Sequence, residues 1–170
     1  MTKTAPTGYS RMQIILHWAV AVLVVVQFLL GPAMSAVAEG LRKGEAVGAS
    51  PVAWAHVAVG ITILVLACWR VGLRFAHGVP TPSFEPKTPE QEFLVFVTRE
   101  LTFFLYLTIF VIPVTGAIGW FYQNEVAATA HASMKVLVIL IVAVHVAISL
   151  FHQFVLRDGA LKRMARPQRD

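Results

Sequence analysis

The chain has 170 residues, a length that fits one domain; 57% of them are hydrophobic and only 14% are charged. Soluble domains carry about 25% charged residues, so the composition excludes an ordinary soluble protein and favours an integral membrane protein. The net charge of +5 does not indicate nucleic-acid binding, because the basic residues gather at the ends of apolar runs and do not interleave with aromatic residues. The single cysteine, Cys68, lies inside an apolar run and is interpreted as a lipid-facing or packing residue.

Four long apolar stretches follow one another along the chain, at residues 14–32, 52–71, 101–120 and 134–156. Each reaches the ~20 residues that a helix needs to cross a hydrocarbon core of about 30 Å. We therefore predict an all-α integral membrane four-helix bundle that forms a single domain over residues 1–170. Between the spans we expect a glycine-containing link at 39–50, a proline-rich link without regular helix at 79–89 and a short polar link at 123–129.

The first apolar run has a rival interpretation as a secretory signal peptide. Lys3 and Arg11 precede the run, and residues 36–38 (AVA) are similar to a signal-peptidase site. A signal-peptide core is only about 7 to 15 residues long, which is shorter than this run, so we expect the run to stay in the protein as the first span.

The distribution of basic residues predicts the orientation in the membrane. Eleven of the 14 Lys and Arg residues fall at the amino end, in the link between the second and third spans or in the tail; the other three are Arg42, Lys43 and Lys135. The positive-inside rule then predicts that both termini are cytoplasmic. The expected location is the bacterial inner (cell) membrane, with several membrane passes.

Four histidines lie in or beside the spans, where ionisable residues are costly and usually functional. By the predicted orientation, His17 and His145 lie toward the cytoplasmic side, and His56 and His131 lie near the outer side. His131 and His145 are 14 residues apart, so they project from nearly one helix face about 21 Å apart. The histidines therefore form two pairs at two depths.

Paired imidazoles on facing helices can take both axial positions of a haem iron. We predict two haems between the helices, one held by His17 and His145 and the other by His56 and His131. The alternative for any one of these histidines is a hydrogen bond to a neighbouring helix. A single zinc or copper cluster is disfavoured, because its ligands would have to converge on one ion.

Other residues are secondary candidates for the same sites. Arg11 and Lys135 could bind haem propionates, or they could only anchor the helices at the membrane surface. His152, seven residues after His145, could contact a quinone or be an interfacial polar residue. We interpret His77 as a solvated loop residue. Small residues could give the cofactors room or could serve ordinary helix packing; they are Gly60, Gly116 and Gly119.

These residues occur in motifs whose order resembles the prokaryotic cytochrome b561 family, which includes the haem-carrying subunits of some membrane hydrogenases. The resemblance covers nearly the whole chain. Its motifs are YSRMQIILHW at residues 9–18, AHVAVGI at 55–61, IPVTG at 112–116, and His131 followed fourteen residues later by His145 within VHV. Carried over by position, the resemblance implies the same two pairs of haem ligands, with b-type haem as the cofactor.

The resemblance also implies electron exchange with quinone or quinol, with an electron-donor or acceptor protein, or with superoxide. Three functions stay open: a dihaem electron carrier, a superoxide:quinone oxidoreductase, and a haem-carrying anchor subunit of a larger dehydrogenase or hydrogenase. The link before the fourth span is shorter than in relatives that use superoxide, and Glu39 and Glu45 balance Arg42 and Lys43 in the outer loop. A weak positive field would steer an anion poorly. A histidine-lined metal transporter is a fourth, less favoured alternative.

Overall fold

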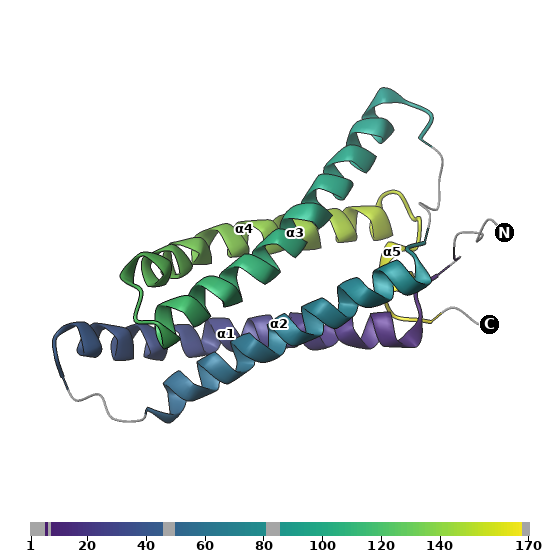
Figure 1. Ribbon diagram of the computed structural model, residues 1–170. Helices are drawn as coiled ribbons and strands as arrows, with labels where there is room; N and C mark the ends of the chain where they lie inside the picture. Colours follow the sequence, from purple (N-terminus) through teal and green to yellow (C-terminus); the bar gives the residue numbers. More distant parts are fainter. Residues whose placement is uncertain (1–5, 7, 46–49, 81–85, 168–170) are drawn as a thin grey trace.

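The computed structural model describes residue 6 and residues 8–45, 50–80 and 86–167. Its helices are α1 (Arg11–Arg42), α2 (Pro51–His77), α3 (Pro89–Phe121), α4 (Glu125–Phe154) and the short α5 (Ala160–Arg163). The described part of the chain contains no strand. α1 packs beside α2 and α3 beside α4, and α2 also contacts α3, so the bundle has two layers (Figure 1). The predicted all-α fold is confirmed.

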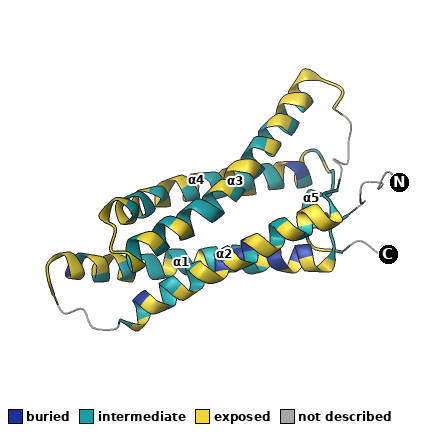
Figure 2. Ribbon diagram, in the orientation of Figure 1, coloured by how far each residue is buried: buried dark blue, intermediate teal, exposed yellow. Residues whose placement is uncertain are grey.

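The four long helices are apolar enough to cross a membrane. The mean hydropathy of their most apolar windows is 2.4, 2.1, 2.1 and 2.6 in chain order. Figure 2 shows that exposed and intermediate residues make up nearly all of the bundle, and the few buried ones lie almost entirely in α1 and α2. An exposed apolar surface of this extent is unfavourable in water but favourable in contact with lipid. The four predicted spans are confirmed, and the chain is a multi-pass membrane protein.

The helices extend beyond the apolar spans because polar residues cap them. The Ser10 side chain accepts a hydrogen bond from the Gln13 backbone N–H at 3.3 Å, and the Gln13 side chain accepts one from the Ser10 N–H at 2.9 Å. This capping box begins α1 ahead of its apolar run. At α3, Thr88 caps the helix and Pro89 occupies the first turn, where its missing N–H costs nothing.

Two of the three predicted links between the spans differ from the structure; in the third, residues 79–80 and 86–88 are not helical, as predicted, and residues 81–85 lie outside the described residues. We expected a polar link at 123–129, but α4 begins at Glu125 after the cap residue Asn124, so most of that segment is helical. Similarly, α1 continues to Arg42, into the predicted link at 39–50. The first part of α3, before its apolar run at 101–120, is also helical and projects beyond the rest of the bundle (Figure 1). Hydropathy marks the apolar core of a helix, whereas the caps decide where the helix begins.

α1 begins, and α2 and α4 finish, at one end of the bundle, which we call the terminal end; α1 and α3 finish at the opposite end (Figure 1). Two hydrogen bonds hold α1 at the terminal end. The Gln13 Nε2 donates to the Gly78 carbonyl at the end of α2 at 3.1 Å, and the Trp18 Nε1 donates to the Met164 carbonyl of the C-terminal segment at 2.9 Å.

Candidate functional site

The structure brings the four span histidines together as two facing pairs. The ring centres of His17 on α1 and His145 on α4 are 6.2 Å apart, with the ring planes at 59°. The ring centres of His56 on α2 and His131 on α4 are 6.1 Å apart, with the planes at 86°. In the described part of the chain, no Cα atom of α4 lies within 8 Å of a Cα atom of α1 or α2. The imidazoles therefore meet between helices whose backbones stay well apart.

These distances fit two imidazoles on opposite sides of one metal ion. A metal–imidazole bond of about 2.0 Å and a further ~1.1 Å from nitrogen to ring centre put two such centres about 6.2 Å apart. The Nδ1 atoms of His17 and His56 are buried without a hydrogen-bond partner. Among the described residues, no three His, Cys, Asp or Glu side chains gather as a larger metal site. The donor set is thus two imidazole pairs, which suits haem iron.

The His131 ring is held by α3. Its Nδ1 lies 2.8 Å from the Ile112 carbonyl oxygen, and a Cβ atom added at Gly116 would lie 2.8 Å from the same nitrogen. When Nδ1 donates to the carbonyl, Nε2 carries no proton and is free to bind a metal, an arrangement usual for metal-binding histidines. Gly116 therefore gives room to the imidazole itself.

The two other candidate glycines serve helix packing, one of the two roles that the sequence left open. A Cβ atom at Gly60 would lie 3.0 Å from the Gln27 side chain, whose Nε2 donates to the His56 carbonyl at 3.0 Å. A Cβ atom at Gly119 would lie 2.9 Å from the backbone of Ala128. The contact of Gln27 with the helical turn at His56 was not predicted, although a glutamine inside an apolar run indicates a hydrogen bond to a neighbouring helix.

Comparison with known proteins agrees with this geometry. The family model described as "Prokaryotic cytochrome b561" matches residues 8–167. The chain belongs to the prokaryotic cytochrome b561 family. It is also 36% identical, over 166 residues, to a protein named cytochrome b562 from Cereibacter sphaeroides; the match covers 97% of this chain and 99% of that protein. Family membership makes the chain a membrane cytochrome, which implies b-type haem and electron transfer.

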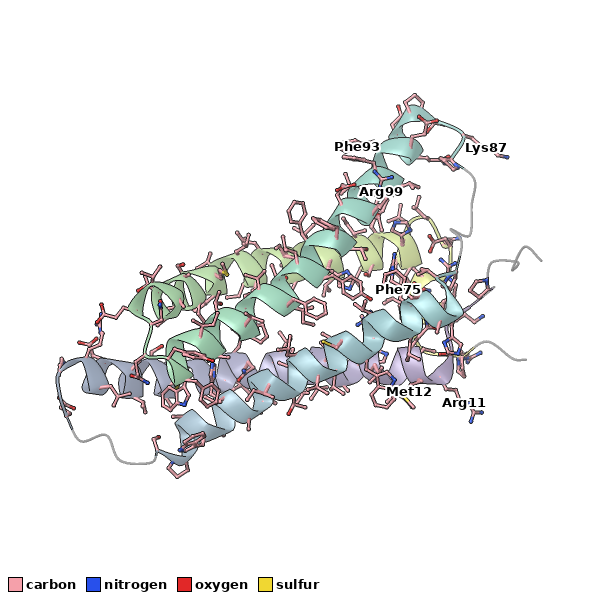
Figure 3. All side chains as sticks on the ribbon, viewed as in Figure 1. Arg11, Met12, Phe75, Lys87, Phe93 and Arg99 are labelled. Atoms are coloured by element: carbon pink, nitrogen blue, oxygen red, sulfur yellow. The ribbon has the colours of Figure 1, made fainter. Side chains whose placement is uncertain are left out.

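In this cytochrome b561 chain, the two basic residues predicted to bind the carboxylates of the cofactor, Arg11 and Lys135, are exposed. Arg11 lies at the start of α1, and its side chain points away from the helices (Figure 3). Lys135 is exposed on α4. Both roles stay predictions. Arg70 on α2 is half-buried, and its charge acts on both His17 and His145. Arg70 was counted only among the basic residues that predict the membrane orientation. It falls inside the predicted span 52–71, where a charged residue usually has a function.

His152 lies at the terminal end of α4 and is buried there. Its Nδ1 is 2.5 Å from the Asp158 Oδ2, and the two side chains are only 11% and 6% exposed. Asp158 Oδ1 also accepts a hydrogen bond from the Ala160 backbone N–H at 3.0 Å. The partnership with Asp158 was not predicted, because a tight turn after α4 brings the two residues together. His77, predicted to be a solvated loop residue, is exposed, but the loop part of that prediction is wrong because His77 is the last residue of α2.

Proposed function

We propose that the chain is a dihaem b-type electron carrier that passes electrons within the bilayer to or from quinone. The pair His17/His145 would hold one haem toward the terminal end, and His56/His131 would hold the other toward the opposite end. The observation that carries the proposal is the meeting of the two imidazole pairs across helices whose Cα atoms stay more than 8 Å apart. Haem iron with two imidazole ligands supplies one-electron transfer and has no open position for oxygen.

The residues around each pair would orient the rings and keep water out. At the opposite end, the Ile112 carbonyl fixes the His131 tautomer, and the Gln27 side chain fixes the backbone turn at His56. At the terminal end, Gln13, Ile14 and Leu16 are buried in the first turns of α1, close in sequence to His17. His152, oriented by Asp158 at the same end, is the proposed quinone contact.

The charges at the opposite end favour this carrier over a superoxide:quinone oxidoreductase. Glu39 forms ion pairs with Arg42 and with Lys43, the latter at 3.5 Å. Because both cations share the single negative charge of Glu39, these pairs weaken the positive field that would otherwise attract a small anion. The membrane orientation that follows from the basic residues has both termini in the cytoplasm.

Haem counting in ligand variants tests the function. We expect the dithionite-reduced minus oxidised spectrum of the purified protein to show two low-spin b haems per chain, and His56→Ala and His145→Ala to lose one haem each, because an iron needs both axial imidazoles. His77→Ala is the control and should keep both haems. A wild-type protein without haem, or a single haem indifferent to both variants, would overturn the proposal.

A further inference from the structure

Arginine and tyrosine side chains from four segments gather at the terminal end. The guanidinium carbons of Arg70 and Arg74, both on α2, each lie 5.8 Å from the ring centre of Tyr106 on α3. Tyr9, just before α1, is half-buried, and the charges of Arg163, Arg70 and Arg74 all act on its phenol. Burial raises the pKa of Tyr9 above its ordinary value, against the lowering effect of these arginines. We call these five residues the arginine–tyrosine cluster.

The cluster lies at the same end of the bundle as the His17/His145 pair. The charge of Arg70 acts on both imidazoles. The helix register agrees: Arg70 lies seven residues before the end of α2, and His17 lies six residues after the start of α1. At 1.5 Å per residue both are about 10 Å from the terminal end. Arg74 lies one turn nearer that end, on the side where a cofactor's charged edge would face water.

Arg70 and Arg74 have no acidic partner among the described residues, whose ion pairs all involve other cations. Two like charges one turn apart on a helix repel each other, and a charge inside a membrane span is costly when no counter-charge is near. Tyr106 offsets part of this cost, because its ring attracts both guanidinium groups. An anion bound between the arginines would offset far more.

We propose that Arg70, supported by Arg74 and Tyr9, binds the propionate carboxylates of the haem held by His17 and His145. This inference rests on the proposed function. A guanidinium group can bind a carboxylate through two parallel hydrogen bonds. The contact with the Tyr106 ring orients the Arg70 side chain before the carboxylate binds. The role differs from the one predicted for Arg11, whose side chain points away from the bundle (Figure 3). A lipid phosphate offers similar anionic oxygens, so the test separates the two sources.

The test compares haem b with its dimethyl ester, whose carboxylates are capped. The full chain is produced in membranes of haem-deficient cells in a His56→Ala background, so that only the His17/His145 pair can bind, and occupancy is followed by the low-spin spectrum. We expect the unsubstituted Arg70 protein to prefer haem over the ester by at least about tenfold, the typical value of a charged hydrogen bond. Arg70→Gln should remove this preference, and Arg70→Lys should keep part of it. Arg99→Gln, which removes an exposed arginine paired with Glu100 at 3.1 Å, should keep all of it.

A second measurement uses the haem-loaded full chain with all histidines intact. Because a nearby positive charge favours the reduced iron, Arg70→Gln should lower one of the two midpoint potentials and leave the other unchanged. If Arg11→Gln removed the preference for haem b over its dimethyl ester and Arg70→Gln did not, the proposal would be overturned in favour of Arg11. Unchanged discrimination and potentials in Arg70→Gln, together with loss of lipid phosphorus from the purified protein, would assign the cluster to a lipid phosphate. Absence of haem from the wild type would instead refute the proposed function.

Discussion

The position of the His131 imidazole depends on the absence of a side chain at Gly116. A Cβ atom there would lie 2.8 Å from both Cε1 and Nδ1 of the ring, a distance that forces the ring to move. The ring would then lose its 2.8 Å contact with the Ile112 carbonyl. Residues that orient a metal-binding histidine in this way are typically worth a factor of roughly 10 to 100 in metal affinity.

Gly116→Ala should therefore weaken haem binding at the His56/His131 pair by about 10- to 100-fold and leave the other haem in place. The measurement is the haem-to-protein ratio, with the visible spectrum, after dilution in detergent. Gly72→Ala is the matched control, because a Cβ atom there meets nothing within 4 Å; it should retain both haems. Two firmly bound haems in Gly116→Ala would mean that His131 does not need its observed position.

At the scale of the helices, Gly119 permits the close approach of α3 to α4. A Cβ atom at this position would lie 2.9 Å from both Cα and N of Ala128, and backbone atoms cannot move aside as a flexible side chain can. Gly119→Leu should separate the two helices near their connection and destabilise the protein by about 1–3 kcal/mol, as overpacking does. Thermal unfolding in detergent, followed by circular dichroism, would show a lower midpoint temperature.

The matched control for this substitution is Gly31→Leu, since Gly31 has open space around its Cα. It should leave the midpoint temperature nearly unchanged. Because His131 follows Ala128 by about one turn, Gly119→Leu should also disturb the His56/His131 pair while the His17/His145 pair keeps its haem. Equal midpoint temperatures for both leucine variants would contradict the role assigned to Gly119.

The sequence was sufficient to predict four long apolar helices and which histidines lie at matching levels along them, because both follow from apolar runs and from residue counts along helices. Helix ends were predicted less well: α4 begins inside the segment expected to be a polar link, owing to the cap at Asn124. Contacts between distant segments had no local signal. Arg70 meets Tyr106 across two helices, and Asp158 meets His152 through a turn; neither pairing follows from hydropathy or spacing. The ligation of haem by the four histidines stays a prediction.

At the scale of the whole molecule, the even number of long helices puts the start of α1 and the end of α4 at one end of the bundle (Figure 1). Most basic residues share that end: Arg70 and Arg74 lie in the last two turns of α2, and the tail after α4 carries Arg157, Lys162 and Arg163. At the opposite end, Glu39 forms ion pairs with both Arg42 and Lys43 and so offsets part of their positive charge. Because basic residues near span ends are retained on the cytoplasmic side, we predict that the terminal end is the cytoplasmic one.

Reporter fusions test this orientation. Green fluorescent protein fused after Asp170 should fluoresce, and alkaline phosphatase fused at the same point should be inactive, because the phosphatase needs the oxidising exterior to form its disulfides. Alkaline phosphatase fused after Lys43, at the opposite end, should be active. The reverse pattern would place the terminal end outside and would move the arginine–tyrosine cluster to the outer surface. The His17/His145 pair would then exchange electrons with an external donor, and His56/His131 with the cytoplasmic side.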